Sequence, residues 1–165
     1  MDKDLTKRLV AGQVTTPAWR SVTVTEENLE ELARQTRLPV VVKPVDSGSS
    51  IGVFIARDGQ ELRRALEESR KLGGRTVLEE YIQGREIQVA VLEDRALPPS
   101  RSSPRRASTT TRTSTSRRGP GGLPGPDPPE WEQRLGEAAL AVFRTIGLSV
   151  YARADFIVTP DGTPI

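Results

Sequence analysis

A lysine followed by a short Gly/Ser segment between two apolar runs is the part of this sequence best suited to chemistry. Residues 40–42 are three valines that lead into Lys43, residues 46–50 are Asp-Ser-Gly-Ser-Ser, and residues 53–55 are apolar again. Gly and Ser let successive backbone N–H groups turn inward, so such a loop can bind anionic oxygens, and its hydroxyls add donors. The pattern therefore predicts a strand, a phosphate-binding loop and a second strand.

An ordinary hairpin turn is the alternative for this segment. The segment lacks the Gly-Lys-Ser/Thr ending of a Walker loop, and it lacks the Gly-x-Gly-x-x-Gly that opens a dinucleotide-binding helix. The loop alone therefore leaves a nucleotide site and a plain turn both open.

Two further sets of charged residues are candidates for a site. Glu79 and Glu86 flank a turn between predicted strands 76–81 and 86–92, where carboxylates can accept bonds from ribose hydroxyls or an adenine amine. The alternative is two solvated glutamates at strand ends. Arg153 and Asp155 share one face of predicted strand 150–158, because side chains alternate along a strand. They suit an oxyanion and a metal ion, or equally a plain salt bridge.

Composition limits the chemistry further. The 165 residues suit one domain or parts of two, and they include no cysteine and no histidine. Thiolate catalysis, structural zinc and a histidine base are therefore excluded, which leaves Lys, Arg, Asp, Glu, backbone donors and a hard cation such as Mg²⁺. No membrane-span or signal-peptide pattern occurs, so we expect a cytoplasmic protein.

The elements that must position these residues follow from periodicity and capping. Helices are predicted over residues 1–12, from a cap at Thr25, from a capping pair at Asp58 and Glu61, and from Pro129. A strand is predicted over residues 19–24. Residues 98–129 consist largely of Arg, Ser, Thr, Pro and Gly, so we expect them to be disordered. Six arginines and no acid lie in residues 101–118, so the rest of the chain is net negative.

Taken together, several runs resemble the D-alanine–D-alanine ligases, members of the ATP-grasp superfamily. The matching runs, in family order, are Met1-Asp2-Lys3, Thr6-Lys7, Val42-Lys43-Pro44, Gly48-Ser49-Ser50-Ile51-Gly52-Val53, Leu78-Glu79-Glu80-Tyr81-Ile82, Gly84-Arg85-Glu86, Gly147-Leu148 and Tyr151-Ala152-Arg153-Ala154-Asp155-Phe156. The resemblance implies an α+β, ATP-grasp fold that grips ATP between two subdomains, incomplete in this chain. We expect the central subdomain at 1–97, the disordered segment at 98–129 and the start of the C-terminal subdomain at 130–165.

The resemblance also assigns ATP-binding residues. Lys3 and Lys43 look like the lysines that bind the ATP phosphates, and Ser49 and Ser50 look like part of the flexible lid over them. Glu79 would hold the adenine or ribose side with backbone groups near Glu80 and Ile82, and Glu86 would take the ribose hydroxyls.

Catalytic roles follow in the same way. Arg153 would steady the oxyanion of the tetrahedral intermediate, with Ser50 as a second catalytic residue, and Asp155 would ligate Mg²⁺ or Mn²⁺. In the implied reaction ATP phosphorylates one D-alanine and the amine of a second attacks the acyl phosphate, for peptidoglycan precursor synthesis. Positioning and electrostatics carry such phosphoryl transfer.

Three departures from the family pattern matter. The family's N-terminal domain is missing, its C-terminal Glu-x-Asn pair would lie beyond Ile165, and residues 98–129 replace its Tyr- and Lys-bearing loop. We therefore expect this chain to be inactive, with weak or no stabilisation by Mg-ATP, because removing groups that act as a unit is costly.

A compensated frameshift is our hypothesis for the replaced loop. Synonymous codons exist for residues 100–115 that, read one base out of frame, encode Val-Glu-Ile-Val-Pro-Glu-Ala-Gly-Phe-Tyr-Asp-Tyr-Glu-Asp-Lys-Tyr. That product resembles the family's loop. A DNA sequence without a one-base offset near Pro99 and before Glu130 would contradict the hypothesis.

Two other functions stay open alongside the ligase. One is another ATP-grasp carboxylate–amine ligase, because substrate choice lies in regions that the chain lacks. The other is an Arg/Ser-rich nucleic-acid-binding segment on a nucleotide-binding fragment, which would show a steep salt dependence. We favour ATP and D-alanine as partners, expect neither nucleic acid nor membrane, and expect a homodimer for the full-length family.

Overall fold

The computed structural model describes residues 2–47, 52–101 and 129–165, which form two units. Unit 1 comprises Met1–Arg8 and Pro17–Tyr81, and unit 2 comprises Leu9–Thr16 and Ile82–Ile165. Residues 82–97 were expected in the central subdomain, with the residues before them. They lie in unit 2 instead, because their strand pairs with a strand near the C-terminus. Both units mix helices with antiparallel strands, so the predicted α+β class is confirmed.

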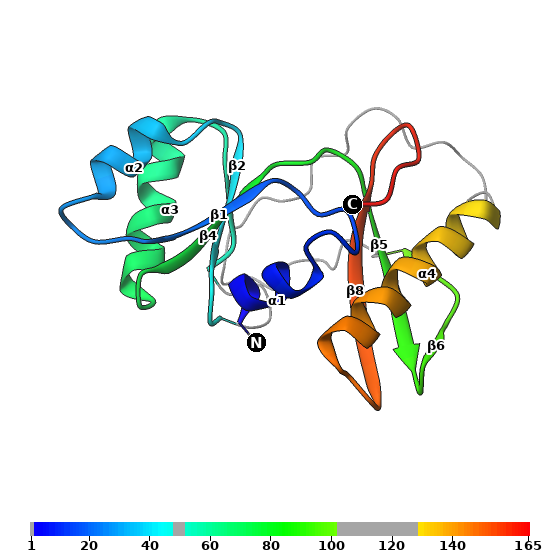
Figure 1. Cartoon of the computed structure of the whole chain (residues 1–165). Coiled ribbons are helices and arrows are strands. Elements are labelled where there is room, and N and C mark those ends of the chain that lie inside the picture. The colour runs from blue at the N-terminus through cyan, green and yellow to red at the C-terminus, as the bar shows by residue number, and fades with distance from the viewer. Residues whose placement is uncertain (1, 48–51, 102–128) are drawn as a thin grey trace, which may run out of the picture. The chain divides into compact units, whose positions relative to one another are not determined.

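Unit 1 is built on a four-stranded sheet in the order β1-β4-β2-β3. The strands are β1 (Trp19–Thr23), β2 (Val40–Pro44), β3 (Phe54–Ala56) and β4 (Arg75–Glu80), and every neighbouring pair is antiparallel. Figure 1 shows α2 (Leu29–Gln35) and α3 (Gly59–Lys71) on one side of this sheet and α1 (Lys3–Val10) on the other. The predicted strand 40–44 and the strand that resumes after the Gly/Ser segment are both present.

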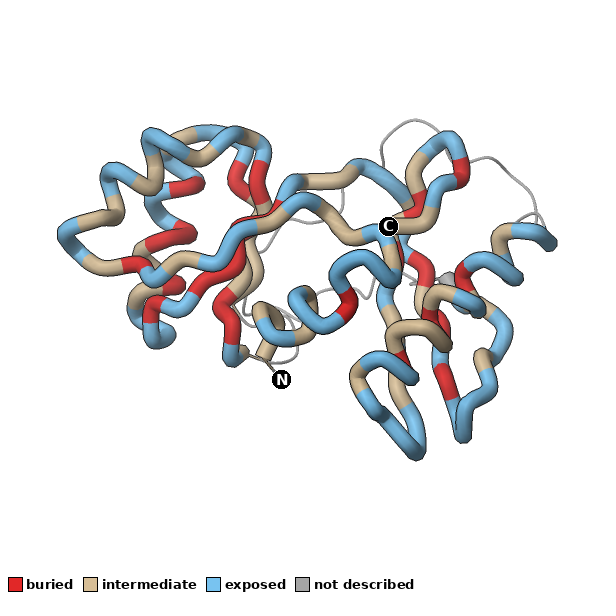
Figure 2. The backbone as a smooth tube through the Cα atoms, viewed as in Figure 1, coloured by how far each residue is buried: buried red, intermediate tan, exposed pale blue. Residues whose placement is uncertain are grey.

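The core of unit 1 lies between the sheet and the pair α2 and α3. Val40 and Val42 of β2 point into it, where they meet Leu62 and Leu66 of α3 and Leu78 of β4. All five side chains are buried, and Figure 2 shows this buried strip along β2, β4 and α3. Alternation along β2 therefore sends Val41 and Lys43 to the opposite face, toward α1.

Helix α3 begins and ends as the sequence predicts. The Asp58 carboxylate accepts the backbone N–H groups of Gln60 and Glu61, at 2.9 and 2.8 Å, and the Glu61 carboxylate accepts the N–H of Arg57 at 2.8 Å. Gly74 follows the helix with φ +77°, where an added Cβ would lie 2.7 Å from the carbonyl oxygen of Val24. Glycine is therefore required at this turn.

Helix α2 begins later than predicted. Thr25 and Asn28 bond reciprocally, since the Thr25 N–H donates to the Asn28 side chain at 2.9 Å and the Asn28 N–H donates to the Thr25 hydroxyl at 3.3 Å. Residues 26–28 form a turn and the helix starts at Leu29. These reciprocal bonds have the pattern of a capping box, so Thr25 caps the turn that leads into α2. The predicted start of the helix directly after Thr25 was wrong, because α2 itself begins at Leu29.

Unit 2 consists of a sheet covered on one side by a helix. β5 (Arg85–Leu92) pairs along its whole length with β8 (Tyr151–Val158), and β6 (Arg95–Ala96) and β7 (Ser100–Arg101) pair with shorter parts of β5. Helix α4 (Pro129–Ile146) packs on the face formed by alternate residues of β5 and β8 (Figure 1). Its contacts come from Leu135, Ala139 and Phe143.

The predicted helix that starts at Pro129 is confirmed, and Gly147 follows its last residue with φ +76°. Residues 159–162 form a turn closed by a bond from the Gly162 N–H to the Thr159 carbonyl oxygen. The predicted disordered segment lies almost wholly at residues 102–128, outside the described residues, so its disorder stays a prediction. No helix within the described ranges is long and apolar enough to cross a lipid bilayer.

Candidate active site

β2 and β4 bring a lysine and a glutamate together on the α1 side of the unit 1 sheet. Glu79 lies opposite Val41 and Lys43 lies opposite Val77, so both side chains leave the sheet on the same face. The Lys43 Nζ is 2.5 Å from Oε2 of Glu79. The Glu79 side chain is only 5% exposed. The alternative of a solvated strand-end glutamate is therefore wrong for Glu79.

Helix α1 adds two lysines to the same face. Lys3 and Lys7 are four residues apart on the helix, so they share one side of it. The Lys7 Nζ lies 3.4 Å from Oε1 of Glu79, so one carboxylate pairs with Lys7 and Lys43 through different oxygens. Burial lowers the pKa of the Lys7 ammonium more than the Glu79 carboxylate raises it. Two lysines thus pair with one acid, which leaves this pair of contacts with a net positive charge.

Lys3 holds the beginning of the Gly/Ser segment. Its Nζ donates to the carbonyl oxygens of Pro44, at 2.8 Å, and Val45, at 3.4 Å, and also to that of Ser47. Burial lowers the pKa of Lys3, and the Lys43 ammonium lowers it further. The loop that follows thus starts beside two cationic side chains, as a phosphate site requires. Ser49 and Ser50 lie outside the described residues, so their roles stay predictions.

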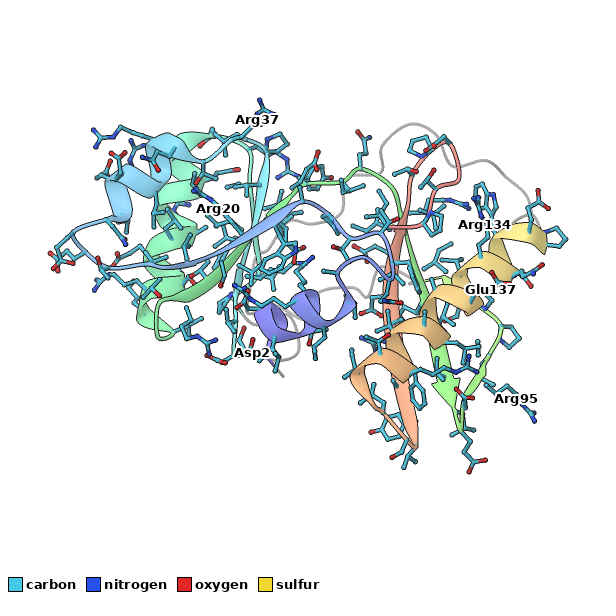
Figure 3. The ribbon with its side chains drawn as sticks, viewed as in Figure 1. Asp2, Arg20, Arg37, Arg95, Arg134 and Glu137 are labelled. Atoms are coloured by element: carbon cyan, nitrogen blue, oxygen red, sulfur yellow. The ribbon has the colours of Figure 1, made fainter. Side chains whose placement is uncertain are left out.

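The start of α1 is fixed to β4 by an acidic residue. Asp2 lies at the beginning of the helix (Figure 3), where its carboxylate accepts the N–H of Leu5 at 2.9 Å. The other oxygen of Asp2 pairs with the Arg75 guanidinium at 3.0 Å. The bond from Leu5 and then the bond from Arg75 lower the pKa of the Asp2 carboxyl. These contacts hold Lys3 and Lys7 over the sheet.

Trp19 and a neighbouring hollow lie at the end of β4. Trp19 of β1 is directly opposite Glu79, and the Lys7 ammonium is 5.9 Å from the centre of its ring. A hollow of about 520 Å³ is lined by Trp19, Leu38, Glu80 and Tyr81, among others. Arg20 also borders it and is labelled in Figure 3. The lining of this hollow also includes Gln35, Thr36 and Arg37, so the hollow is open and mixed in polarity.

The other predicted nucleotide contacts are less enclosed. Glu80 is exposed, and its backbone N–H donates to the carbonyl oxygen of Ala18 at 2.8 Å. Ile82 lies in the segment that joins β4 to β5 and is partly exposed. The roles assigned to Glu80 and Ile82 stay predictions.

Unit 2 carries a second polar face, on the side of its sheet opposite α4. Glu86 and Gln88 of β5 and Arg153 and Asp155 of β8 point to this side, because the residues between them are those that pack toward the helix. Gln88 lies directly opposite Asp155. Glu86 is exposed, so the solvated alternative describes its surroundings correctly.

Arg153 and Asp155 form a two-bond ion pair on this face. Nε and Nη2 of Arg153 lie 2.8 and 3.1 Å from the two oxygens of Asp155. The hydrogen bond and then the charge of Asp155 raise the pKa of Arg153. Both side chains are more than half exposed. The salt-bridge alternative is therefore what the structure shows, and the roles toward an oxyanion and a metal ion stay predictions.

A magnesium ion would find few protein ligands on this face. The described part of the chain contains no group of three or more His, Cys, Asp or Glu side chains that could enclose a metal. Mg²⁺ commonly takes one or two carboxylates and completes its shell with substrate phosphates and water. Exposed Asp155 therefore fits an ion that arrives with a nucleotide, and not a permanent all-protein site.

Two residues of the candidate site were missed by sequence reasoning. Lys7 was noted in a motif without a role, although its helical spacing from Lys3 indicates a shared face. Gln88 was noted only as a member of an alternating strand, although the period of two from Glu86 places it beside Asp155. In both cases the spacing along the sequence indicated which face carries the residue, but it did not show which residue of another element lies beside it.

Comparison with known proteins identifies the family. The family model described as "D-ala D-ala ligase C-terminus" matches residues 12–165. The D-alanine–D-alanine ligase of Clostridium botulinum (strain Eklund 17B / Type B) is 30% identical over 99% of this chain and 55% of its own length. Among solved structures, the D-alanine–D-alanine ligase of Bacillus anthracis complexed with ATP has a TM-score of 0.70 and 30% identity, over 99% of this chain and 50% of its own.

A second solved structure broadens the comparison. The VanG D-Ala:D-Ser ligase of Enterococcus faecalis has a TM-score of 0.74 and 26% identity, over 99% of this chain and 50% of its own. The chain thus spans about half the length of the relatives that it matches. The ATP-grasp fold predicted from the sequence is confirmed by these neighbours. With its family model matching nearly the whole sequence, the chain belongs to the D-alanine–D-alanine ligase family, to the part that forms the C-terminal region of those enzymes.

Proposed function

We propose that this chain is the ATP-binding part of an ATP-dependent ligase that joins two D-alanines. One observation carries the proposal: within a member of this family, Lys7 and Lys43 pair with buried Glu79, and Lys3 binds the backbone at the beginning of the Gly/Ser segment. Such a net positive cluster beside a loop of backbone donors suits the phosphates of a nucleotide. An ATP substrate also favours the cytoplasm as its location.

The proposed roles divide between the two units. In unit 1, Lys3 and Lys43 contact the phosphates together with Ser49 and Ser50, and Glu79 accepts bonds from the base or ribose. In unit 2, Glu86 takes the ribose hydroxyls. This division follows the resemblance, and the burial of Glu79 supports it, because a fixed buried carboxylate is a more selective acceptor than a solvated one.

The proposed reaction uses no histidine or cysteine, in agreement with the composition. The γ-phosphoryl group of ATP is transferred to a carboxylate oxygen of the first D-alanine, which gives an acyl phosphate and ADP. The amine nitrogen of the second D-alanine then forms a bond to the carbonyl carbon, and inorganic phosphate leaves with the electrons of the broken C–O bond. The amine proton passes to solvent. Arg153 stabilises the oxyanion formed in this second step.

Asp155 would hold the magnesium ion that accompanies the nucleotide. When bound, the ion would neutralise phosphate charge. Asp155 would have to separate from Arg153 to bind the ion. Because this ion pair is exposed, its separation costs little free energy.

The proposal leaves open which amino acid is the second substrate, the one that supplies the amine. D-serine is a second candidate, because one structural neighbour is a D-Ala:D-Ser ligase with a similar TM-score. Both substrates present the same amine to the acyl phosphate, so the reaction is unchanged.

Nucleotide binding is the first test of the proposal. We expect titration calorimetry of the chain with Mg-ATP to show saturable binding in roughly the millimolar range. Lys43→Met should abolish it, whereas Lys71→Met should not. Lys71 is the matched control because it is the remaining lysine and lies half-exposed on α3, paired with Glu68. Equal binding by both variants, or no binding by the unsubstituted chain, would contradict the proposal.

Substrate choice is tested separately by phosphate release. The chain is incubated with Mg-ATP and D-alanine, D-serine or L-alanine. Release stimulated by D-alanine alone would support the D-alanine ligase, and stimulation by a mixture of D-alanine and D-serine beyond D-alanine alone would support the second candidate. Because we expect this chain to be inactive by itself, the expected result is binding without stimulated release, which restricts the function of this chain to nucleotide binding.

A further inference from the structure

Lys7 is a partly buried charged residue at the candidate site for which neither the family resemblance nor the proposed reaction has a use. Its side chain is 13% exposed, and its ammonium lies 3.4 Å from the Glu79 carboxylate and 5.9 Å from the centre of the Trp19 ring. Within the described residues, Lys7 and Lys43 are the two cations within 4.0 Å of that carboxylate. Lys3 instead binds backbone carbonyls. The Glu79 carboxylate therefore has two cationic partners, one for each oxygen.

A bound phosphate would compete with Glu79 for the Lys43 ammonium. Its Nζ lies 2.5 Å from Oε2 of Glu79, which uses one of its three N–H donors, and the negative charge of a phosphate would draw the ammonium away from that oxygen. When the ammonium turns to a phosphate, Oε2 loses its partner. A buried carboxylate without any cation nearby is strongly unfavourable, so this move needs a second cation that stays in place.

We propose that Lys7 is a positioning residue that keeps the Glu79 carboxylate paired while Lys43 moves from Glu79 to the phosphates of the nucleotide. The inference rests on the proposed function, since it assumes that Lys43 binds ATP. Lys7 itself stays on Oε1 of Glu79 and does not contact the nucleotide.

The surroundings of Lys7 suit a fixed position. Its helix is fastened to β4 through Asp2 and Arg75, at 3.0 Å, so the backbone that carries Lys7 is held against the sheet. The centre of the Trp19 ring lies 5.9 Å from the Lys7 ammonium, within range of a cation–π contact. Lys43 is more exposed, at 29%, and lies next to the Gly/Ser segment. Of the two partners of Glu79, Lys43 is thus the one with room to move.

The test compares the affinities of Lys7 variants for ATP and for adenosine by titration calorimetry. Lys7→Met and Lys7→Gln should each weaken ATP binding by roughly tenfold, because Lys43 is then retained by Glu79. Adenosine binding should change less than twofold, since it does not require Lys43. Lys7→Arg should restore most of the ATP affinity, and Lys71→Met is the matched control. A merely structural role would weaken both ligands equally, and that result would overturn the inference.

A double substitution separates positioning from direct contact. If Lys7 acts by pairing with the Glu79 carboxylate, adding Lys7→Met to Glu79→Gln should cause no further loss of ATP affinity relative to Glu79→Gln alone, because that carboxylate charge is then absent. A further tenfold loss would show that Lys7 binds phosphate itself and would overturn the inference. If the unsubstituted chain binds no ATP, the proposed function fails and this inference fails with it. If it binds ATP and Lys7→Met is unchanged, only the inference fails.

Discussion

Replacing Glu79 by glutamine removes the buried charge with which two partly buried lysines pair. Removing one partner of a buried ion pair costs about 3–5 kcal/mol of folding free energy. The cost should be lower here, because Lys43 is 29% exposed and its ammonium can turn to water. Lys7, at 13% exposed, cannot do so as easily. We therefore expect Glu79→Gln to lower the free energy of unfolding of unit 1 by about 2–3 kcal/mol.

Glu80→Gln is the matched control for this prediction. It is the same chemical change at the next residue of the same strand, but Glu80 is exposed and its carboxylate has no ion pair among the described residues. We expect its effect to stay within about 0.5 kcal/mol.

Urea unfolding followed by tryptophan fluorescence measures both variants. The chain has two tryptophans, Trp19 in unit 1 and Trp131 in unit 2, so a Trp131→Phe background leaves a reporter beside Glu79 alone. A loss of 2–3 kcal/mol should lower the unfolding midpoint by on the order of 2 M urea for a unit of this size. If Glu79→Gln and Glu80→Gln unfold at the same midpoint, the buried carboxylate does not hold α1 on the sheet and the reasoning is refuted.

Three further predictions concern charge, a buried hydrogen bond and a helix cap. In a lysine-labelled chain, NMR titration should find the pKa of Lys7 below 10.5, through burial, and that of Lys71 above it, through its bond to Glu68; the reverse order would contradict this. A lowered folded pKa means that the unfolded chain binds more protons, so Lys7 makes stability rise with pH from its folded pKa up to 10.5. The Thr76 hydroxyl already donates to a backbone carbonyl, so Ser69 is the donor in their 2.6 Å bond. Thr76→Val should therefore cost about 1–3 kcal/mol in urea unfolding and Ser69→Ala less, and equal costs would argue against that direction. Asp58→Ala should cost about 1 kcal/mol by removing the acceptor of two N–H groups, whereas Asp58→Asn should cost little.

Local patterns predicted the elements of this chain well, because the signals are carried by neighbouring residues. Asp58 and Glu61 lie three residues apart and mark the start of α3 through bonds within that turn. The period of two along β8 placed Arg153 and Asp155 on one face before any partner strand was known. Thr25 also bonds locally, to Asn28, but these bonds close a turn that precedes the helix, and α2 begins at Leu29.

The partners across the sheets were not predictable from such patterns. Glu79 lies 36 residues from Lys43 in the sequence, and its burial depends on α1 packing over the sheet. Nothing near Glu79 distinguishes it from exposed Glu80, and only the register of β4 against β2 decides which of them faces the lysines. The helical spacing of Lys3 and Lys7 implied that they share one face of the helix. Which residues that face contacts depends on tertiary packing, which the spacing does not show.

The ion pairs around Asp155 and around Glu79 differ in the free energy that a ligand needs to separate them. Arg153 and Asp155 are more than half exposed, and exposed pairs contribute about 0–1 kcal/mol, so a nucleotide or a metal ion can separate them at little cost. Glu79 is buried, and separating it from a single cation would be far more costly. A site on the unit 2 face can therefore work with one pair of opposite charges. A site in unit 1 that needs Lys43 to move requires a second lysine on the same carboxylate, which is where the structure places Lys7.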